Sequence, residues 1–153
     1  MAIWGKENNR WQRPVNCSIL NAGRVTKSSS LYETAAWGKT NQPAFLNQAL
    51  EIETVLNAKQ LIRHILKVEK KMGRVREEKY GERMIDIDII FFNNEIHKTT
   101  FLEIPHPEMQ NRRFVLVPLA EIIPTAVHPV FLKTVAELLE DCADKLEVKR
   151  IAD

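Results

Sequence analysis

The sequence predicts an α+β fold, with helices packed on a mainly antiparallel sheet. The chain has 153 residues, of which 44% are apolar and 27% charged, and this size suits one globular domain with its own core. Segments with the alternating pattern of strands are interleaved with segments that have the three- and four-residue spacing of helices. No repeat or linker is present, so we expect residues 1–153 to form a single domain.

Two strands are predicted in the first third of the chain. Residues 24–34 are rich in β-branched and hydroxyl side chains and lack a helical apolar stripe, which favours an extended strand. Residues 45–54 alternate, and Leu46, Leu50 and Ile52 share one face. This alternation predicts a half-buried strand.

A helix is predicted to follow, with Asn57 as its N-cap and Gly73 at its end. Its apolar residues recur at helical steps and form one stripe: Leu61, Ile62, Ile65, Leu66, Val68 and Met72.

The second half of the chain predicts one more long strand and two helices. Residues 84–92 alternate, and Asn93-Asn94 predicts a turn into a short partner strand. Residues 114–123 are apolar enough for a core helix, which Pro118 must begin, kink or split. Thr134 and Glu137 have the spacing of a capping box and predict the start of a final short helix.

Composition and motifs exclude several classes of protein. The net charge is +2, which is too balanced for a surface devoted to nucleic acid or lipid, and no apolar stretch could span a bilayer or serve as a signal peptide, so we expect a cytoplasmic protein. Cys17 and Cys142 form no metal or disulfide pattern and are expected to be free thiols. Gly38-Lys39-Thr40 resembles the end of a P-loop, but Glu33 stands where that motif requires glycine, and no G-x-G-x-x-G occurs.

Asp86 and Asp88 are the strongest local signal for chemistry. In a strand they project from the same face with Cα atoms about 6.6 Å apart, while Ile85, Ile87 and Ile89 enter the core. Paired carboxylates at this spacing suit Mg²⁺ bound together with substrate phosphates. A solvent-facing strand face is the alternative interpretation.

A basic segment precedes this strand. Residues 67–83 contain seven basic and four acidic side chains, a net charge of +3, and include Gly73 and Gly81. Cations beside a metal site are what phosphoryl transfer requires, although a solvated helix end would look the same. His106, held between Pro105 and Pro107, is either aimed at a site or a structural turn residue.

Several motifs, in order along residues 23–129, resemble one enzyme family. They include residues 30–34 (SLYET), 45–47 (FLN), 73–76 (GRVR), 80–90 (YGERMIDIDII), 104–107 (IPHP), 111–114 (NRRF) and 128–129 (HP). Residues 81–88 fit the pattern G-[PSAE]-R-x-x-D-[LIV]-D. The chain therefore resembles the 6-hydroxymethyl-7,8-dihydropterin pyrophosphokinase family of folate biosynthesis.

The resemblance implies a ferredoxin-like α/β sandwich and transfer of pyrophosphate from ATP to the hydroxymethyl group of the pterin, with AMP released. It implies two Mg²⁺ ions bound by Asp86 and Asp88, and catalytic roles for Arg74, Arg83 and Asp88. The implied ATP-binding residues are Glu69, Arg76, Tyr80, His106 and Arg112. The implied pterin-binding residues are Thr34, Phe45, Asn47, Asp86 and Phe114.

The N-terminus departs from the family pattern. Residues 1–22 show neither the apolar first strand nor the loop and helix that relatives have, and Pro14 opposes a helix there. This departure raises the alternative of a catalytically inactive homologue that binds pterin or nucleotide. An RNA-binding domain is disfavoured, because the Asp pair would repel phosphates without a metal. We expect a monomer that binds small molecules, without nucleic acid or membrane partners.

Overall fold

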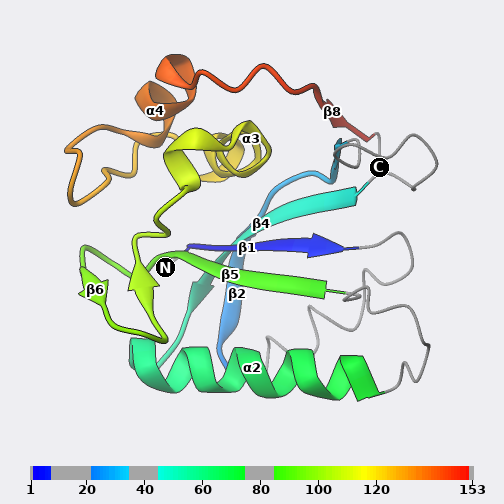
Figure 1. Ribbon diagram of the computed structural model, residues 1–153, viewed down its shortest axis with the longest axis vertical. Coiled ribbons are helices and arrows are strands. Elements are labelled where there is room, and N and C mark those ends of the chain that lie inside the picture. The colour runs from blue at the N-terminus through cyan, green and yellow to red at the C-terminus, as the bar shows by residue number, and fades with distance from the viewer. Residues whose placement is uncertain (1, 8–21, 35–44, 75–84, 152–153) are drawn as a thin grey trace.

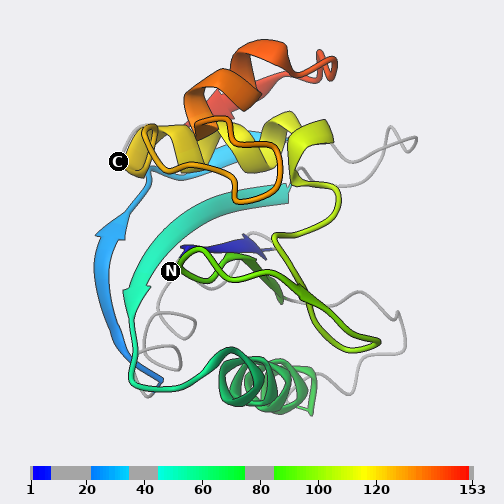
Figure 2. The same ribbon diagram turned by 90° about the vertical axis from the view of Figure 1, so that its left-hand side faces the viewer.

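The structure is a computed structural model that describes residues 2–7, 22–34, 45–74 and 85–151; side chains are described except at 2–7, 71–74 and 85–86. A six-stranded sheet lies between helices on its two faces, as Figures 1 and 2 show. The predicted α+β class with a mainly antiparallel sheet is confirmed.

The sheet has the strand order β5–β1–β4–β3–β8, and β2 also pairs with β4. Its strands are β1 (Ala2–Glu7), β2 (Arg24–Ser28), β3 (Tyr32–Thr34), β4 (Phe45–Glu53), β5 (Ile85–Phe91) and β8 (Val148–Arg150). Every pairing in it is antiparallel. A separate pair of short strands, β6 (His97–Lys98) and β7 (Glu103–Ile104), forms a hairpin.

The expectation that the N-terminus lacks a first strand is wrong for residues 2–7. These residues form β1, which lies between β4 and β5 and pairs with both. Lys6 is opposite Asn47 on one side and Asp86 on the other, so this strand sets the register between β4 and β5. The expectation for residues 8–21, which include Cys17, lies outside the described residues.

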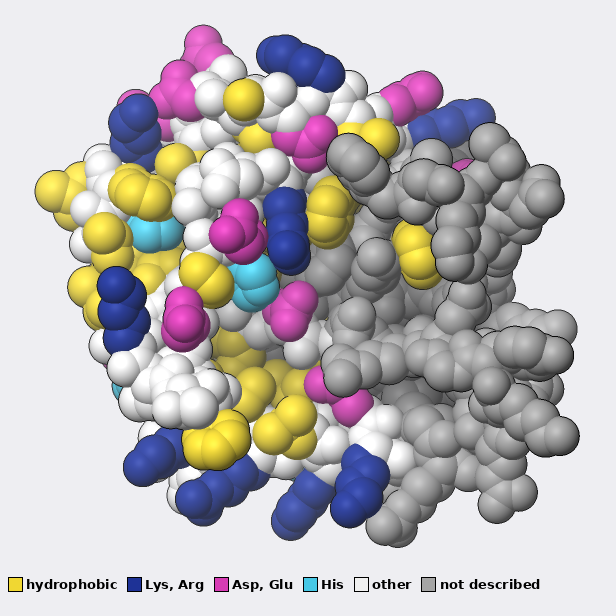
Figure 3. All heavy atoms as spheres, viewed as in Figure 1, with side chains coloured by type: hydrophobic (Ala, Val, Ile, Leu, Met, Phe, Trp, Pro, Cys, Tyr) yellow, Lys and Arg dark blue, Asp and Glu magenta, His cyan; other side chains and the backbone are white. Residues whose placement is uncertain are grey.

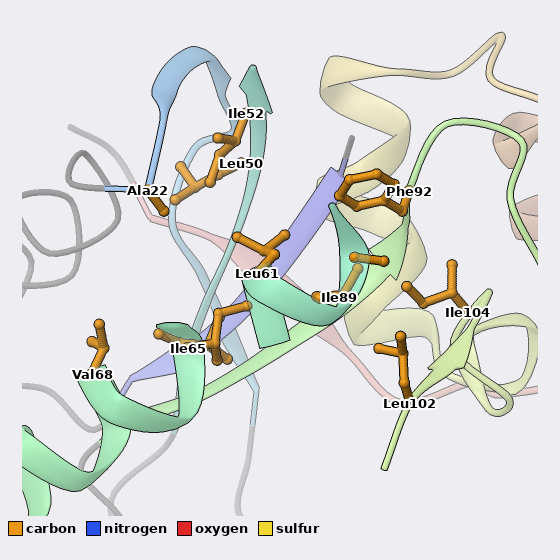
Figure 4. Close-up of a cluster of buried hydrophobic side chains, with 12 residues drawn as sticks. Ala22, Leu50, Ile52, Leu61, Ile65, Val68, Ile89, Phe92, Leu102 and Ile104 are labelled. Carbon is orange, nitrogen blue, oxygen red and sulfur yellow. The ribbon is translucent and has the colours of Figure 1, made fainter. Parts of the chain in front are cut away.

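Helix α2 (Ala58–Arg74) covers one face of the sheet. Its N-terminus is a capping box, because the Asn57 side chain accepts from the Gln60 N–H at 2.8 Å while the Gln60 side chain accepts from the Asn57 N–H at 2.9 Å. The helix continues through Gly73 to Arg74, one residue beyond the predicted end. Leu61, Ile65 and other buried residues pack against β4 and β5, as in Figure 4.

Helix α3 (Arg113–Ile122) lies on the opposite face, together with α4 (Val135–Asp141). Pro118 lies inside α3 without ending it. The predicted capping box at Thr134 and Glu137 is confirmed, with both of its hydrogen bonds present. Buried Cys142 is a free thiol, as predicted.

Helices on both faces change the expected burial of β4. The sequence predicted a half-buried strand, but Asn47 and Ala49 on the second face are 0% exposed, because α3 covers that face while Leu50 and Ile52 face α2. Ile87 and Ile89 of β5 are buried on the α2 side, as predicted. Ile90 is buried on the α3 side, which is also the side of Asp88 in the alternation of β5.

Two pairing predictions need correction. Residues 24–34 form two strands, because three residues lie between Ser28 and Tyr32 where β4 has two between their partners Leu50 and Asn47. At this irregularity the Ser29 N–H donates to Ala49 O, and the Ser29 hydroxyl accepts from the Ala49 N–H. The turn at Asn93-Asn94 exists, with Asn93 at φ 53°, but β6 pairs with β7 and not with β5. A segment after β7 contacts the edge of β5 instead, since the His106 N–H donates to Ile90 O at 3.1 Å.

Candidate functional site

The candidate site lies on the α3 side of the sheet, across the neighbouring strands β3, β4, β1 and β5 and beside the segment before α3. Thr34 and Asn47 come from adjacent strands, and the register places Thr34 opposite Phe45. Asn47 and Asp86 are both opposite Lys6, so their Cα atoms are about 10 Å apart across β1. The topology therefore brings three separate parts of the predicted site to one region of the sheet.

Asn47 is fully buried and only partly satisfied. Its Nδ2 donates to Thr34 Oγ1 at 2.9 Å, and Thr34 is itself buried. Its Oδ1 is buried and has no hydrogen-bond partner in the described part of the chain. A buried carbonyl oxygen without a donor destabilises a folded protein by about 1–3 kcal/mol, and such groups are uncommon. Asn47 Oδ1 is therefore an acceptor for which the described protein atoms supply no donor.

Two aromatic residues lie near this region, one at the start of β4 and one in the first turn of α3. Phe45 begins β4, two residues before Asn47, and is half-buried. Phe114, in the first turn of α3, packs against the buried cluster that contains Ala49 and Ile90. The guanidinium of Arg112 lies 5.9 Å from the centre of the Phe114 ring.

Asp88 and His106 face each other at the edge of the sheet. The Asp88 side chain is 39% exposed, and its Oδ2 lies 4.0 Å from His106 Nε2. The Glu108 N–H donates to His106 Nδ1 at 3.1 Å, so the proton of the neutral ring is on Nε2, the atom facing Asp88. Burial lowers the pKa of His106, against the opposing effect of Asp88, and Arg112 lowers it further. His106 therefore presents a neutral donor toward the Asp88 carboxylate.

The structure places the remaining predicted residues only in part. Glu69 lies in α2, Arg74 is the last residue of that helix, and Asp86 is in β5; the side chains of Arg74 and Asp86 are outside the described part. Arg76, Tyr80 and Arg83 lie outside the described residues altogether. Among the side chains that are described, no three His, Cys, Asp or Glu residues are grouped as a metal site. The one structural signal that sequence reasoning missed is the unpaired oxygen of Asn47, which only burial reveals.

No helix in the described ranges has the length and hydrophobicity that crossing a bilayer requires.

The chain matches the family model of 7,8-dihydro-6-hydroxymethylpterin-pyrophosphokinase (HPPK) over residues 6–124. It is 42% identical over 113 residues to a 2-amino-4-hydroxy-6-hydroxymethyldihydropteridine pyrophosphokinase of Aquifex aeolicus, covering 74% of this chain and 71% of that protein. It is 49% identical over 98 residues to the protein of the same name from Bacillus subtilis, covering 64% of this chain and 59% of that protein.

A crystal structure of Plasmodium falciparum HPPK-DHPS A437G with SDX-DHP has a similar fold. Its TM-score is 0.70 at 17% sequence identity, and the match covers 92% of this chain but 44% of the Plasmodium chain. This structural similarity supports the α+β fold. The relationship to the pyrophosphokinases rests on the family match and the sequence identities given above.

Proposed function

The chain belongs to the 7,8-dihydro-6-hydroxymethylpterin-pyrophosphokinase family. Its relatives in Aquifex aeolicus and Bacillus subtilis are named as pyrophosphokinases. We propose that this chain likewise transfers pyrophosphate from ATP to 6-hydroxymethyl-7,8-dihydropterin in folate biosynthesis. The alternative of a catalytically inactive homologue finds no support in these relationships.

The observation that carries the pterin site is the buried, unpaired Oδ1 of Asn47. A pterin presents N–H donors on the edge of a flat ring, and one of them would satisfy this oxygen. Thr34 holds the Asn47 amide by accepting from Nδ2, so the orientation of Oδ1 is defined before the substrate arrives. Phe45 and Phe114 would stack on the two faces of the pterin ring, an arrangement that favours flat heterocycles.

The ATP side of the site would be formed by Asp88 and its neighbours. Asp86 and Asp88, two residues apart on β5, would hold two Mg²⁺ ions; their carboxylate oxygens are hard ligands that suit this ion, and the Asp88 side chain is accessible enough to bind it. Bound Mg²⁺ would supply charge neutralisation for the triphosphate. The Nε2–H of His106 and the guanidinium of Arg112 would donate to phosphate oxygens beside Asp88. Glu69, Arg76 and Tyr80 are the remaining residues proposed for the nucleotide.

In the proposed reaction the pterin hydroxyl oxygen attacks the β-phosphorus of ATP. The new bond joins this oxygen to the β-phosphorus, the bond between the β-phosphorus and the α-phosphate bridging oxygen breaks, and AMP leaves. Asp88 takes the hydroxyl proton, while Arg74 and Arg83 stabilise the negative charge on the transferring group. The aromatic pair and Asn47 contribute by orienting the hydroxymethyl group toward the nucleotide.

The finer features of the fold are part of the same proposal. The succession β3, β4, α2, β5, with β1 between β4 and β5, agrees with a ferredoxin-like β-α-β-β-α-β arrangement. A sheet that includes both β1 and β8 supports a single domain for residues 1–153.

An assay of AMP release with ATP, Mg²⁺ and 6-hydroxymethyl-7,8-dihydropterin tests the function directly. We expect AMP to form only when all three are present, and Asp88→Asn to abolish it. Asp141→Asn, on an exposed carboxylate of α4 that pairs with Lys133, is the matched control and should leave turnover unchanged. A correctly folded wild-type protein that releases no AMP would refute the proposed activity.

A further inference from the structure

A cavity lies beside the candidate site, between the β6–β7 hairpin and the turn that follows α3. Its volume is about 290 Å³, near the lower end for pockets that bind small molecules. Its walls come from residues 96–98 of the hairpin region, the segment 103–107, Gln110, and the residues His128, Val130 and Phe131. His106 belongs to both this cavity and the Asp88 site. Thr34, Asn47, Phe45 and Phe114 do not line it.

His128 offers this cavity one fixed donor. Its Nδ1 accepts from the N–H groups of Val130 and Phe131, both at 3.1 Å, so the ring proton is on Nε2. The ring stacks on Phe131 with centres 4.4 Å apart and meets the edge of Phe91 at 5.8 Å, which holds its orientation. Burial lowers the pKa of His128, so the ring is neutral at pH 7. No described residue accepts a hydrogen bond from Nε2, and this donor is left for a ligand or water.

Gln110, which also lines the cavity, carries an acceptor without a partner in the described part of the chain. Its Nε2 donates to Pro107 O at 2.8 Å, and this bond decides which end of the amide is nitrogen. Its Oε1 is buried and has no partner among the described residues. This oxygen has almost no accessible surface, so a ligand donor would reach it after a small shift of the Gln110 side chain, and would then remove the cost of leaving it unpaired.

The rest of the lining is mostly apolar, and its polar members are His97, Lys98, Glu103 and His106. Ile96 is 56% exposed and Val130 is 54% exposed, so water covers apolar surface at the rim of the cavity. Figure 3 shows hydrophobic side chains gathered around a histidine on the left of this face. Lys98 and Glu103 are opposite each other in the β6–β7 register and balance each other's charge. The lining therefore favours a neutral ligand with flat apolar faces.

We propose that this cavity is a binding site for a neutral, flat heteroaromatic molecule of one or two rings. An acceptor atom on the ring edge would take the His128 Nε2–H, a donor on the same edge would bond to Gln110 Oε1, and the ring would lie against Phe131. Adjacent acceptors and donors of this kind occur in purine and pterin bases. The proposal does not depend on the transfer activity, since His128 and Gln110 have no role in the proposed transfer and Asn47 does not line the cavity.

Free adenine, a neutral purine without phosphates, is the probe that we would use. The chain has four histidines, so the ring nitrogens of a ¹⁵N-histidine-labelled protein can all be followed by NMR. We expect adenine to shift the His128 resonances strongly and those of His64, on α2, not at all, with a dissociation constant on the order of 1 mM for so small a ligand. Absence of a His128 shift at 10 mM adenine would overturn the proposal.

Variants inside and outside the cavity distinguish adenine binding at this site from adenine binding elsewhere on the protein. Phe131→Ala should weaken adenine binding about fivefold to tenfold, because it removes the stacking surface. Phe101→Ala is the matched control: Phe101 is 85% exposed and does not line the cavity, so affinity should not change. Val130→Trp, which would fill the cavity from its exposed rim, gives a second test if Phe131→Ala proves unstable, and it should abolish the His128 shift.

Indole tests recognition of the ring edge. It has the size of adenine and one N–H donor but no ring acceptor, so it should bind at least several times more weakly. Equal affinity for indole and adenine, or unchanged adenine affinity in both Phe131→Ala and Val130→Trp, would overturn the proposal.

Discussion

We expect Asn47, which is hydrogen-bonded to Thr34, to lower the stability of the fold while it contributes to pterin binding. Asn47 is 0% exposed, Thr34 is 4% exposed, and the bond between them leaves Asn47 Oδ1 unpaired. Thr34→Val should lower the free energy of unfolding by about 1–3 kcal/mol, because it leaves the Asn47 Nδ2 without its acceptor. Asn47→Leu in the Thr34→Val background removes both unpaired groups, so the double variant should recover about 1–3 kcal/mol.

For a chain of this length, 1 kcal/mol corresponds to roughly 2–4 °C in Tm. Urea unfolding of the wild type and the Thr34→Val, Asn47→Leu and double variants would give the four free energies, with equal slopes showing that the unfolded states are comparable. Calorimetry with the pterin alcohol should show affinity lowered about 10- to 100-fold in both variants that carry Asn47→Leu. A double variant less stable than Thr34→Val, with unchanged pterin affinity, would refute the reasoning and make Asn47 a purely structural residue.

Four further predictions follow from the described contacts. Leu132 has φ 57° and is 77% exposed, so Leu132→Gly should raise the free energy of unfolding by about 0.5–1 kcal/mol in urea titrations, and a decrease would contradict this. Asp88→Asn should lower AMP release at least 100-fold while the circular dichroism spectrum is kept, and near-normal turnover in saturating Mg²⁺ would argue against its proposed role. The pKa values of His106 and His128 lie below the ordinary 6.5, so the unfolded chain binds more protons than the folded chain as the pH falls below 6.5. The free energy of unfolding should therefore be highest above that pH and decrease below it. His128→Gln should reduce the difference in unfolding free energy between pH 7.5 and pH 5.5. Burial and the bond to Glu121 raise the pKa of Tyr32 to about 12, so absorbance titration of wild type against Tyr32→Phe should find this tyrosine still protonated at pH 11.

Local signals were sufficient for the helices and for one strand. The caps of α2 and α4 connect residues three apart in the chain, so Asn57 with Gln60 and Thr134 with Glu137 could be read directly from the sequence. The alternation of β5 likewise predicted buried Ile87 and Ile89 with Asp88 on the other face. These features depend on neighbours within about one turn or two residues, and the sequence contains that information explicitly.

Strand partners and double-sided burial required the tertiary structure. Residues 2–7 carry no clear strand pattern, yet they form β1, because β4 and β5 supply hydrogen-bond partners on both sides. Ala49 and Asn47 looked like an exposed face until α3, more than sixty residues later, covered them. Sheet pairing is decided by contacts between distant residues, and alternation within one segment does not identify them.

The candidate site divides in the same way. The sequence alone determined the family, the Asp86–Asp88 pair and the order of the motifs, because these are properties of short segments. Only the tertiary structure decided that Asn47 keeps an unpaired oxygen beside Thr34, that His106 presents its Nε2–H to Asp88, and that His128 and Gln110 line one cavity. Whether a polar atom is buried, and which partner it finds there, depends on segments that meet only when the chain folds.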